Sequence, residues 1–333
     1  MNIKNPFFYL LFATLFLTYS CQDDESFEEE GFGVAFGIRQ DKNLADYEAV
    51  AAANNPALPN FKAVIAFSYS LDGSAKAEYI ASGTLIAPQW ILTAAHNFYD
   101  ASEQKKPALA KGITIKTGDD PNNPTQTYTV SQIVIHPTWL HGNQDFQHAN
   151  DLCLVKVSSP INTITPVKLH TTSTEPIGGT IWFCGFGDYS GAPGQNPNLE
   201  SKKHAIENIL DRKVEGLKTT HETTVYSGGL LAFDFDDPLG AINALGDNIV
   251  NADEGILGAG TSSAGAVNLE GATVEGDSGG PLFVKNGSVW ELAGVLSGGA
   301  LDPVPGHKKS DYGDISVFTR VSTAYSWIQS VIK

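Results

Sequence analysis

Cysteine is scarce in this chain of 333 residues, which holds only three. None of Cys21, Cys153 and Cys184 stands in a CxxC or CxxC…HxxxH pattern, which argues against a zinc site and against a disulfide-stapled scaffold. Cys153 and Cys184 lie inside apolar, strand-like runs. We therefore expect two small buried side chains there, and the sequence leaves open whether the two sulfurs are bonded.

Positive charge is also scarce, with 21 Lys and Arg against 37 Asp and Glu and a net charge of −16. A field of this sign repels phosphate backbones, which excludes nucleic acid as a partner. Charged residues of both signs make up 17% of the chain, against a usual value of about 25%. With 42% hydrophobic residues, the chain is expected to fold, and the profile is typical of an exported, β-rich protein.

No apolar run is long enough to span a bilayer. The longest, residues 7–17, follows Lys4 and predicts a signal peptide over residues 1–20. Ser20 directly before Cys21 resembles the lipobox of bacterial lipoproteins, so Cys21 is expected to carry lipid, although an ordinary signal peptide with Cys21 as a bystander remains the alternative. The acidic residues that follow, up to Glu30, predict a solvated tether over 21–30. We therefore predict that the protein is held by this lipid at the bacterial cell envelope, in one interpretation on its outer surface. The alternative is that it is secreted.

Short apolar runs rich in Val, Ile, Thr and aromatic residues alternate with turn residues and predict an all-β protein. The expected strands are residues 63–69, 79–86, 91–94, 113–117, 127–135, 151–157, 181–186, 205–210, 230–235, 281–284, 290–297 and 317–321. Helical periodicity is confined to residues 322–332, which predict a short terminal helix. Residues 242–275 are dense in Gly, Ala, Asn and Ser, and a loop of this length is usually functional.

Two segments have the composition of a nucleophilic site. Residues 90–96 form an apolar run that ends in His96, and residues 275–283 enclose Ser278 between glycines. A serine hydroxyl needs a neighbouring base to take its proton and a third group to orient that base. Without Cβ atoms nearby, the N–H groups of Gly276 and Ser278 are able to point at the oxyanion of a tetrahedral intermediate.

The chain resembles the trypsin-like serine proteases of the chymotrypsin fold over residues 60–332. The motifs that carry this resemblance, in the family's order, are ASGTLI (81–86), WILTAAH (90–96), IVIHP (133–137), NDLCLVKV (150–157), FCGFG (183–187), GDSGGP (276–281), LSGG (296–299) and VFTRVSTAYSWI (317–328). The resemblance implies two six-stranded antiparallel β-barrels with a short C-terminal helix. The first barrel with its adjoining segment is expected over 31–168, and the second over 169–333 with an insertion near 242–275.

The same resemblance implies Ser278 as nucleophile, His96 as general base and Asp151 as the residue that orients His96. Asp145 is the rival for that third role, and the apolar run directly after Asp151 favours Asp151. Gly276 and Ser278 are implied as oxyanion donors. GDSGG also fits the GxSxG pattern of α/β-hydrolases, but that fold needs a helix after the serine and the order Ser, Asp, His. Other histidines without a motif, among them those at 170 and 204, are predicted to be surface residues.

The chain departs from the family at the disulfide that usually staples the loop of the catalytic histidine, because Ala81 and Asn97 stand at the two cysteine positions. It also departs at the specificity pocket, where Ala272 stands at the position that often sets primary specificity and no carboxylate is present to attract Lys or Arg. Pocket walls are expected from four further residues: Ser297, Gly298, Gly299 and Ser316. These residues predict a preference for uncharged or hydrophobic side chains.

In the family, the residue at Asp277 pairs with a new N-terminal ammonium released by cleavage, usually at an Ile-Val-Gly-Gly start. The chain has no such start. Cleavage before Ile38 is one interpretation, and pairing of Asp277 with an internal cation such as Arg39 is the other.

Together these patterns predict a secreted or lipid-anchored serine endopeptidase that works through an acyl-enzyme on proteins or peptides. It is expected to be a monomer, to need no cofactor and no catalytic metal, and to meet a membrane only through its lipid. A structural calcium has no recognisable ligand pattern. The alternative is a catalytically weak or inactive homologue that serves as a surface binding module. The presence of His96, Asp151, Ser278 and Gly276 together favours the enzyme.

Overall fold

The computed structural model describes residues 37–102, 104, 106–146, 150–189, 202–246, 254–300 and 311–333. The predicted signal peptide, the acidic tether and Cys21 lie outside these residues, so they stay predictions. Among the helices that the structure describes, none combines the length and the apolar character needed to cross a membrane.

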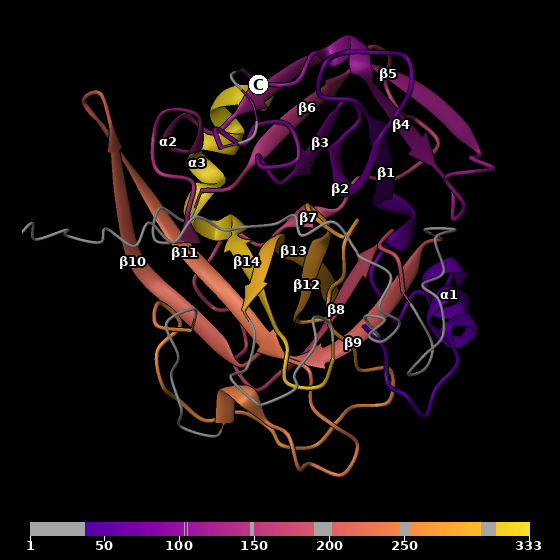
Figure 1. Ribbon diagram of the computed structural model, residues 1–333, viewed down its shortest axis with the longest axis vertical. Coiled ribbons are helices and arrows are strands. Elements are labelled where there is room, and N and C mark those ends of the chain that lie inside the picture. Colours follow the sequence, from indigo (N-terminus) through magenta and orange to yellow (C-terminus); the bar gives the residue numbers. More distant parts are fainter. Residues whose placement is uncertain are drawn as a thin grey trace, which may run out of the picture. The chain divides into compact units, whose positions relative to one another are not determined.

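Six strands form a closed barrel in the order β1-β2-β3-β6-β5-β4 (Figure 1). They are β1 (Val64–Tyr69), β2 (Tyr79–Ala87), β3 (Trp90–Thr93), β4 (Ile113–Thr117), β5 (Gln126–Ile135) and β6 (Cys153–Val157). All six were expected from the sequence. Their β-branched and aromatic residues either alternate between core and solvent, as in β4, or are buried throughout, as in β3.

The remaining strands form a second, eight-stranded sheet in the order β10-β11-β14-β13-β12-β8-β9, with β7 paired in parallel to β13. They are β7 (Lys168–Leu169), β8 (Thr180–Gly185), β9 (His204–Ile209), β10 (Arg212–His221), β11 (Thr224–Asp234), β12 (Pro281–Asn286), β13 (Val289–Ala300) and β14 (Ile315–Arg320). The all-β fold class is confirmed, and the arrangement is consistent with a two-barrel, chymotrypsin-like fold. The strand count of the second sheet exceeds the six that were expected, since β7 and β10 had not been predicted.

The helices of the described residues pack against strands of the second sheet. They are α1 (Leu44–Ala52), α2 (Pro137–His141) and α3 (Val321–Ile332), with 3₁₀ turns η1 (Phe61–Ala63), η2 (Ala110–Gly112) and η4 (Ala244–Gly246). The terminal helix α3 was predicted, and it buries Val321, Ala324, Trp327 and Ile328. Helix α1 was not, because only Tyr47 and Ala51 face the core and two residues make no recognisable period.

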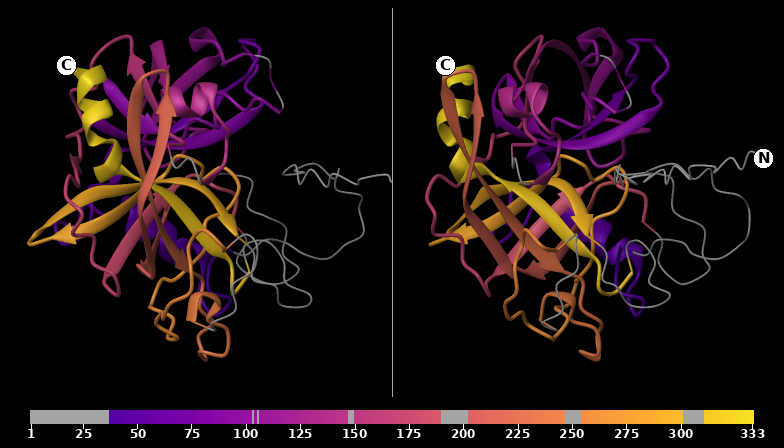
Figure 2. Two further views of the ribbon diagram at one scale, coloured as in Figure 1. Left: turned by 90° about the vertical axis from the view of Figure 1, so that its left-hand side faces the viewer. Right: turned by 60° about the vertical axis from the view of Figure 1, so that its left-hand side comes forward.

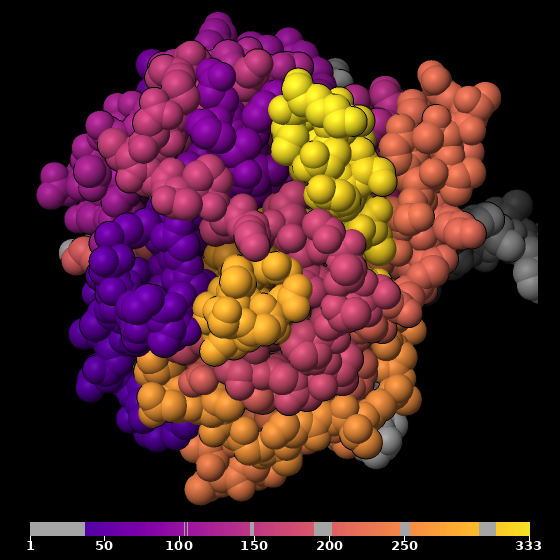
Figure 3. Space-filling view, turned by 180° about the vertical axis from the view of Figure 1, so that it is seen from behind, coloured from indigo at the N-terminus to yellow at the C-terminus, as the bar shows by residue number. Residues whose placement is uncertain are grey.

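His136 joins the first barrel to the second sheet. Its buried ring contacts Tyr226 on β11 and Trp327 on α3, with ring centroids 4.8 and 4.7 Å away. Figure 3 shows α3 lying on the surface beside β10 and β11, and Figure 2 shows that hairpin extending from the second sheet. Burial lowers the pKa of His136 to about 3, so the ring is neutral at physiological pH.

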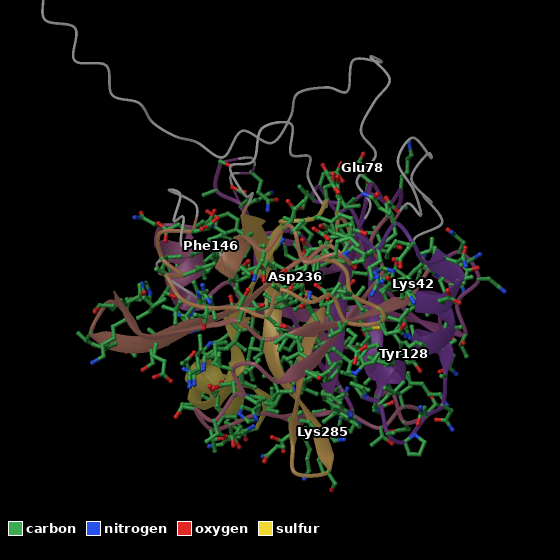
Figure 4. The ribbon with its side chains drawn as sticks, turned by 90° about the horizontal axis from the view of Figure 1, so that it is seen from below. Lys42, Glu78, Tyr128, Phe146, Asp236 and Lys285 are labelled. Carbon is green, nitrogen blue, oxygen red and sulfur yellow. The ribbon has the colours of Figure 1, made fainter. Side chains whose placement is uncertain are left out.

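Four buried carboxyl groups lie close together, and one of them, Glu270, belongs to the insertion predicted near 242–275. Asp236 donates its backbone N–H to the Glu270 carboxyl at 2.8 Å, and Asp236 is labelled in Figure 4. Burial raises the pKa of Asp236 to about 9 and that of Glu270 to about 8. The pKa values of Asp211 and Asp234 are raised as well, again chiefly by burial. The raised pKa values of these carboxyl groups favour their neutral forms, which limits the charge buried there.

Candidate active site

Antiparallel pairing of β3 with β6 brings His96 and Asp151 together. Thr93, the last residue of β3, lies opposite Cys153, the first residue of β6. His96 follows Thr93 and Asp151 precedes Cys153, so both emerge at the same end of the strand pair. The structure thus brings Asp151 to His96, whereas the rival Asp145 is exposed on the preceding loop.

The Asp151 carboxylate is only 2% exposed and accepts four hydrogen bonds. One oxygen accepts from the backbone N–H groups of Ala95 and His96, at 2.7 and 2.9 Å. The other lies 2.6 Å from His96 Nδ1 and accepts from the Ser297 hydroxyl at 2.7 Å. An ionised carboxylate accepts and does not donate, so Nδ1 of His96 carries a proton and Nε2 is left as the basic nitrogen of the neutral ring. The His96 side chain is 25% exposed and open to a reactant.

Ser278 stands on a turn packed against the strand that leads to His96. Its carbonyl accepts from the N–H of Ser82 at 2.9 Å and from the Asn97 side chain at 3.1 Å. Gly279, at φ +82°, lies so close to β3 that a Cβ there would fall 2.0 Å from Thr93 Oγ1. Asn97 therefore ties the histidine segment to the serine turn directly.

Asn97 stands where a family cysteine was found to be missing, and its amide also donates to Thr93 Oγ1 at 3.2 Å. Hydrogen bonds thus link the histidine loop to the serine turn in a chain that lacks the bridge. Both cysteines of the described residues, Cys153 and Cys184, are free and buried, which answers the question about their pairing. Burial raises the pKa of each thiol well above its usual value, so neither acts as a thiolate.

The turn around Ser278 presents two backbone donors. Gly276, at φ +91°, adopts a conformation that favours glycine. Within the part of the chain that the structure describes, the N–H groups of Gly276 and Ser278 have no protein acceptor. Unpaired N–H groups at a half-buried turn are suited to bind an anionic oxygen.

The residues predicted to bind substrate differ in burial and in hydrogen bonding. Ala272 is buried, and the hydroxyl of Ser316 contacts Thr273 Oγ1 at 3.0 Å and the Thr273 N–H at 3.2 Å. The hydroxyl of Ser297 bonds to Asp151, which leaves only its backbone for a substrate. Gly299 is exposed.

Phe146, labelled in Figure 4, lies over Gly298, where a Cβ would fall 3.1 Å from the phenyl ring. An apolar ring therefore lies beside the predicted pocket wall. No sequence motif had indicated Phe146.

The prediction that His170 and His204 lie on the surface is wrong, since each is only 1% exposed. His170 pairs with Glu291 at 3.0 Å, and His204 lies 3.3 Å from Asp277. Carboxylate partners distant in sequence account for both burials, and no local motif signals them. Over the described residues, no group of three or more His, Cys, Asp or Glu side chains is arranged to hold a metal ion.

Comparison with known proteins supports the resemblance over most of the chain. The family model described as Trypsin matches residues 59–228 and 247–328. The chain is 28% identical to a tryptase of Mus musculus over 262 residues, which cover 76% of this chain and 79% of that protein. It is 26% identical to transmembrane protease serine 11C of Mus musculus over 255 residues, covering 74% of this chain but 46% of that longer protein.

Proposed function

The chain belongs to the trypsin family of serine proteases, and from this premise we propose that it is a serine endopeptidase whose triad is Ser278, His96 and Asp151. The observation that carries the proposal is the four-bonded Asp151 carboxylate, which leaves His96 Nε2 basic beside the turn of Ser278. Two N–H groups on that turn, which have no acceptor among the described residues, are the proposed donors to the oxyanion.

In the proposed reaction, His96 Nε2 takes the proton of Ser278 Oγ as the oxygen attacks the peptide carbonyl. The N–H groups of Gly276 and Ser278 bind the resulting oxyanion, and Asp151 stabilises the imidazolium. His96 then gives the proton to the leaving amine, and the acyl-enzyme forms. Water, deprotonated by His96, releases the acid and restores the serine.

Labelling with a fluorophosphonate probe tests this proposal, because the probe reacts with an activated serine. We expect one label per chain, on the peptide that contains Ser278, and no label in Ser278→Ala. Ser131→Ala, which removes a serine hydroxyl on β5, is the matched control and keeps full labelling. A folded chain that takes no label would instead favour the inactive surface-binding homologue.

We further propose that the enzyme prefers uncharged or hydrophobic residues before the scissile bond. Ala272 offers no charge to a substrate side chain, and the hydroxyl of Ser316 is bonded to Thr273. Cleavage of a diverse peptide library is expected to follow uncharged residues, and Ala272→Asp is expected to shift it toward Lys and Arg. Dominant cleavage after Arg or Lys by the unaltered enzyme would contradict the preference.

The proposals for cellular location and oligomeric state rest on the sequence alone. We propose that the chain is exported as a monomer, that Cys21 carries the lipid, and that the acidic tether holds the protease away from the envelope. Proteins or peptides are its proposed substrates.

A further inference from the structure

Asp277 lies between the two proposed oxyanion donors, Gly276 and Ser278. Whatever holds its side chain therefore restrains the backbone between the two donors. The side chain is 0% exposed. A buried carboxylate needs hydrogen bonds and a compensating charge to stay ionised inside a protein. The partners of Asp277 thus bear directly on the conformation of the oxyanion loop, which we define as residues 274–279.

Three donors bind the Asp277 carboxylate. One oxygen accepts from the N–H of Gly187 at 2.9 Å. The other accepts from the Tyr189 hydroxyl at 2.7 Å and from the N–H of Val274 at 3.0 Å. Gly185 makes room for the carboxylate, because a Cβ there would fall 2.0 Å from Asp277 Oδ1. The carboxylate therefore sits in a cavity shaped for it by the FCGFG segment and closed by Tyr189.

Among the described residues, His204 is the one Lys, Arg or His side chain that the structure places at ion-pair distance from Asp277. Its Nε2 lies 3.3 Å from Asp277 Oδ1, an ion-pair distance without hydrogen-bond alignment. Its Nδ1 lies 3.1 Å from the carbonyl of Lys202, and its ring packs on Tyr189 with centroids 3.7 Å apart. A carbonyl only accepts, so Nδ1 carries a proton. The Lys202 carbonyl and the Tyr189 ring thus hold the imidazole of His204 against the Asp277 carboxylate.

The uncut chain occupies the space beside this cluster. A Cβ on Gly37 would fall 2.5 Å from Val274 and 2.6 Å from Tyr189. The Gly37 carbonyl accepts from the N–H of Ala272 at 2.9 Å, and Ile38 is completely buried. The peptide bond between Gly37 and Ile38 is thus packed into the protein body, where a protease reaches it only after local opening.

Arg39, the internal cation considered from the sequence, is engaged elsewhere. Its guanidinium bonds to both carboxylate oxygens of Asp41, at 2.8 and 2.7 Å, and to the carbonyl of Val267 at 2.7 Å. The position next to Asp277 is filled by His204 instead.

We infer that Tyr189 and His204 are positioning residues that hold the oxyanion loop in its working conformation, so that this protease is active without cleavage before Ile38. The inference rests on the proposed function, since it concerns the donors of the same active site. It assigns to one side chain on β9 and one on the segment after β8 the task that, in the family, falls to a newly released ammonium group.

The first test asks whether the uncut chain is active. Purified protein whose Gly37–Ile38 bond is shown intact by mass spectrometry is treated with the fluorophosphonate probe, and labelled chains are counted. We expect the intact chain to be labelled completely, and acetylation of its terminal amine to leave the labelling rate unchanged. Labelling only of chains that begin at Ile38 would overturn the inference while supporting the proposed protease. Failure of both forms to react would instead count against the proposed function.

The second test separates positioning from general stability. Tyr189→Phe and His204→Leu are each expected to lower kcat by roughly tenfold to a hundredfold, with KM little changed, because poorly aimed donors weaken binding of the oxyanion. Affinity for a peptide boronate, which forms a tetrahedral adduct on the serine, is expected to fall by the same factor. His204→Gln keeps a side-chain hydrogen-bond donor beside Asp277 and is expected to lose less than His204→Leu.

Matched controls remove similar buried groups that make no printed contact with Asp277. Tyr47→Phe deletes a buried hydroxyl that donates to the Glu270 carbonyl at 2.9 Å, and His170→Gln breaks a buried histidine–carboxylate pair. Both are expected to keep kcat and boronate affinity within about twofold of the unaltered enzyme. Folded Tyr189→Phe and His204→Gln variants with unchanged kcat, or equal losses of kcat in the controls, would refute the positioning role.

Discussion

Replacement of Ser278 by alanine is expected to lower kcat by about 10⁴- to 10⁶-fold while KM stays nearly constant. Alanine lacks the oxygen that forms the acyl-enzyme, so water must attack the substrate directly. The backbone of residue 278 is held by Ser82 and Asn97 through its carbonyl, and these bonds do not involve the hydroxyl. The oxyanion donors therefore survive the change. Steady-state hydrolysis of a fluorogenic peptide measures the loss, with stability followed by thermal unfolding.

A double variant sharpens this prediction. Residues that act as a unit show non-additive losses, so His96→Ala combined with Ser278→Ala is expected to be no slower than Ser278→Ala alone. If the two losses multiplied, His96 and Ser278 would not belong to one catalytic unit. A Ser278→Ala enzyme that retained most of its turnover would show that another nucleophile carries the reaction.

Replacement of Asp151 by asparagine is expected to lower kcat by about 10⁴-fold, the size of the same change in another trypsin-family enzyme. The Asp151 carboxylate accepts from three N–H groups and a hydroxyl. An amide of the same shape places an NH₂ group against one of these donors. If that group faces the ring, His96 is driven to the tautomer that has its proton on Nε2 and can no longer take the proton of Ser278. The kcat of the folded variant, measured from pH 6 to pH 10, checks the loss.

Asp145 supplies the comparison for this prediction. It is the other carboxylate considered for the role, and it lies exposed on the loop before Asp151. Asp145→Asn is expected to keep kcat within about twofold. A large loss in Asp145→Asn together with a small one in Asp151→Asn would reverse the assignment.

Local runs of apolar and β-branched residues predicted most of the strands, but they did not predict β10. Strands such as β3 and β6 are largely buried apolar runs, so their composition alone indicates that they lie in the core. Strand β10 alternates half-buried and exposed polar residues on a hairpin with β11, and its pairing rather than its burial makes it a strand. Helix α1 was missed similarly, since Tyr47 is buried through contacts with residues more than two hundred positions away, including the Glu270 carbonyl.

The proposed reacting residues were recognisable because chemistry restricts which residue types serve as nucleophile and base. A nucleophile enclosed by glycines and a histidine at a strand end are unusual enough to stand out, and their order matched one family. Asn97, Tyr189 and His204 have no such signature. Each acts through a partner that the chain brings near only on folding: the carbonyl of Ser278 for Asn97, and the carboxylate of Asp277 for the other two.

The amino-acid sequence therefore sufficed for the all-β class, the trypsin-like family and the candidate triad, because these depend on residue types in short segments and on their order. The way the oxyanion loop is held could be read only from the folded chain. A buried charge must find its partners in space, and those of Asp277 come from β9, from the segment after β8 and from the turn before Ser278. No spacing along the sequence predicts that these groups come together around Asp277.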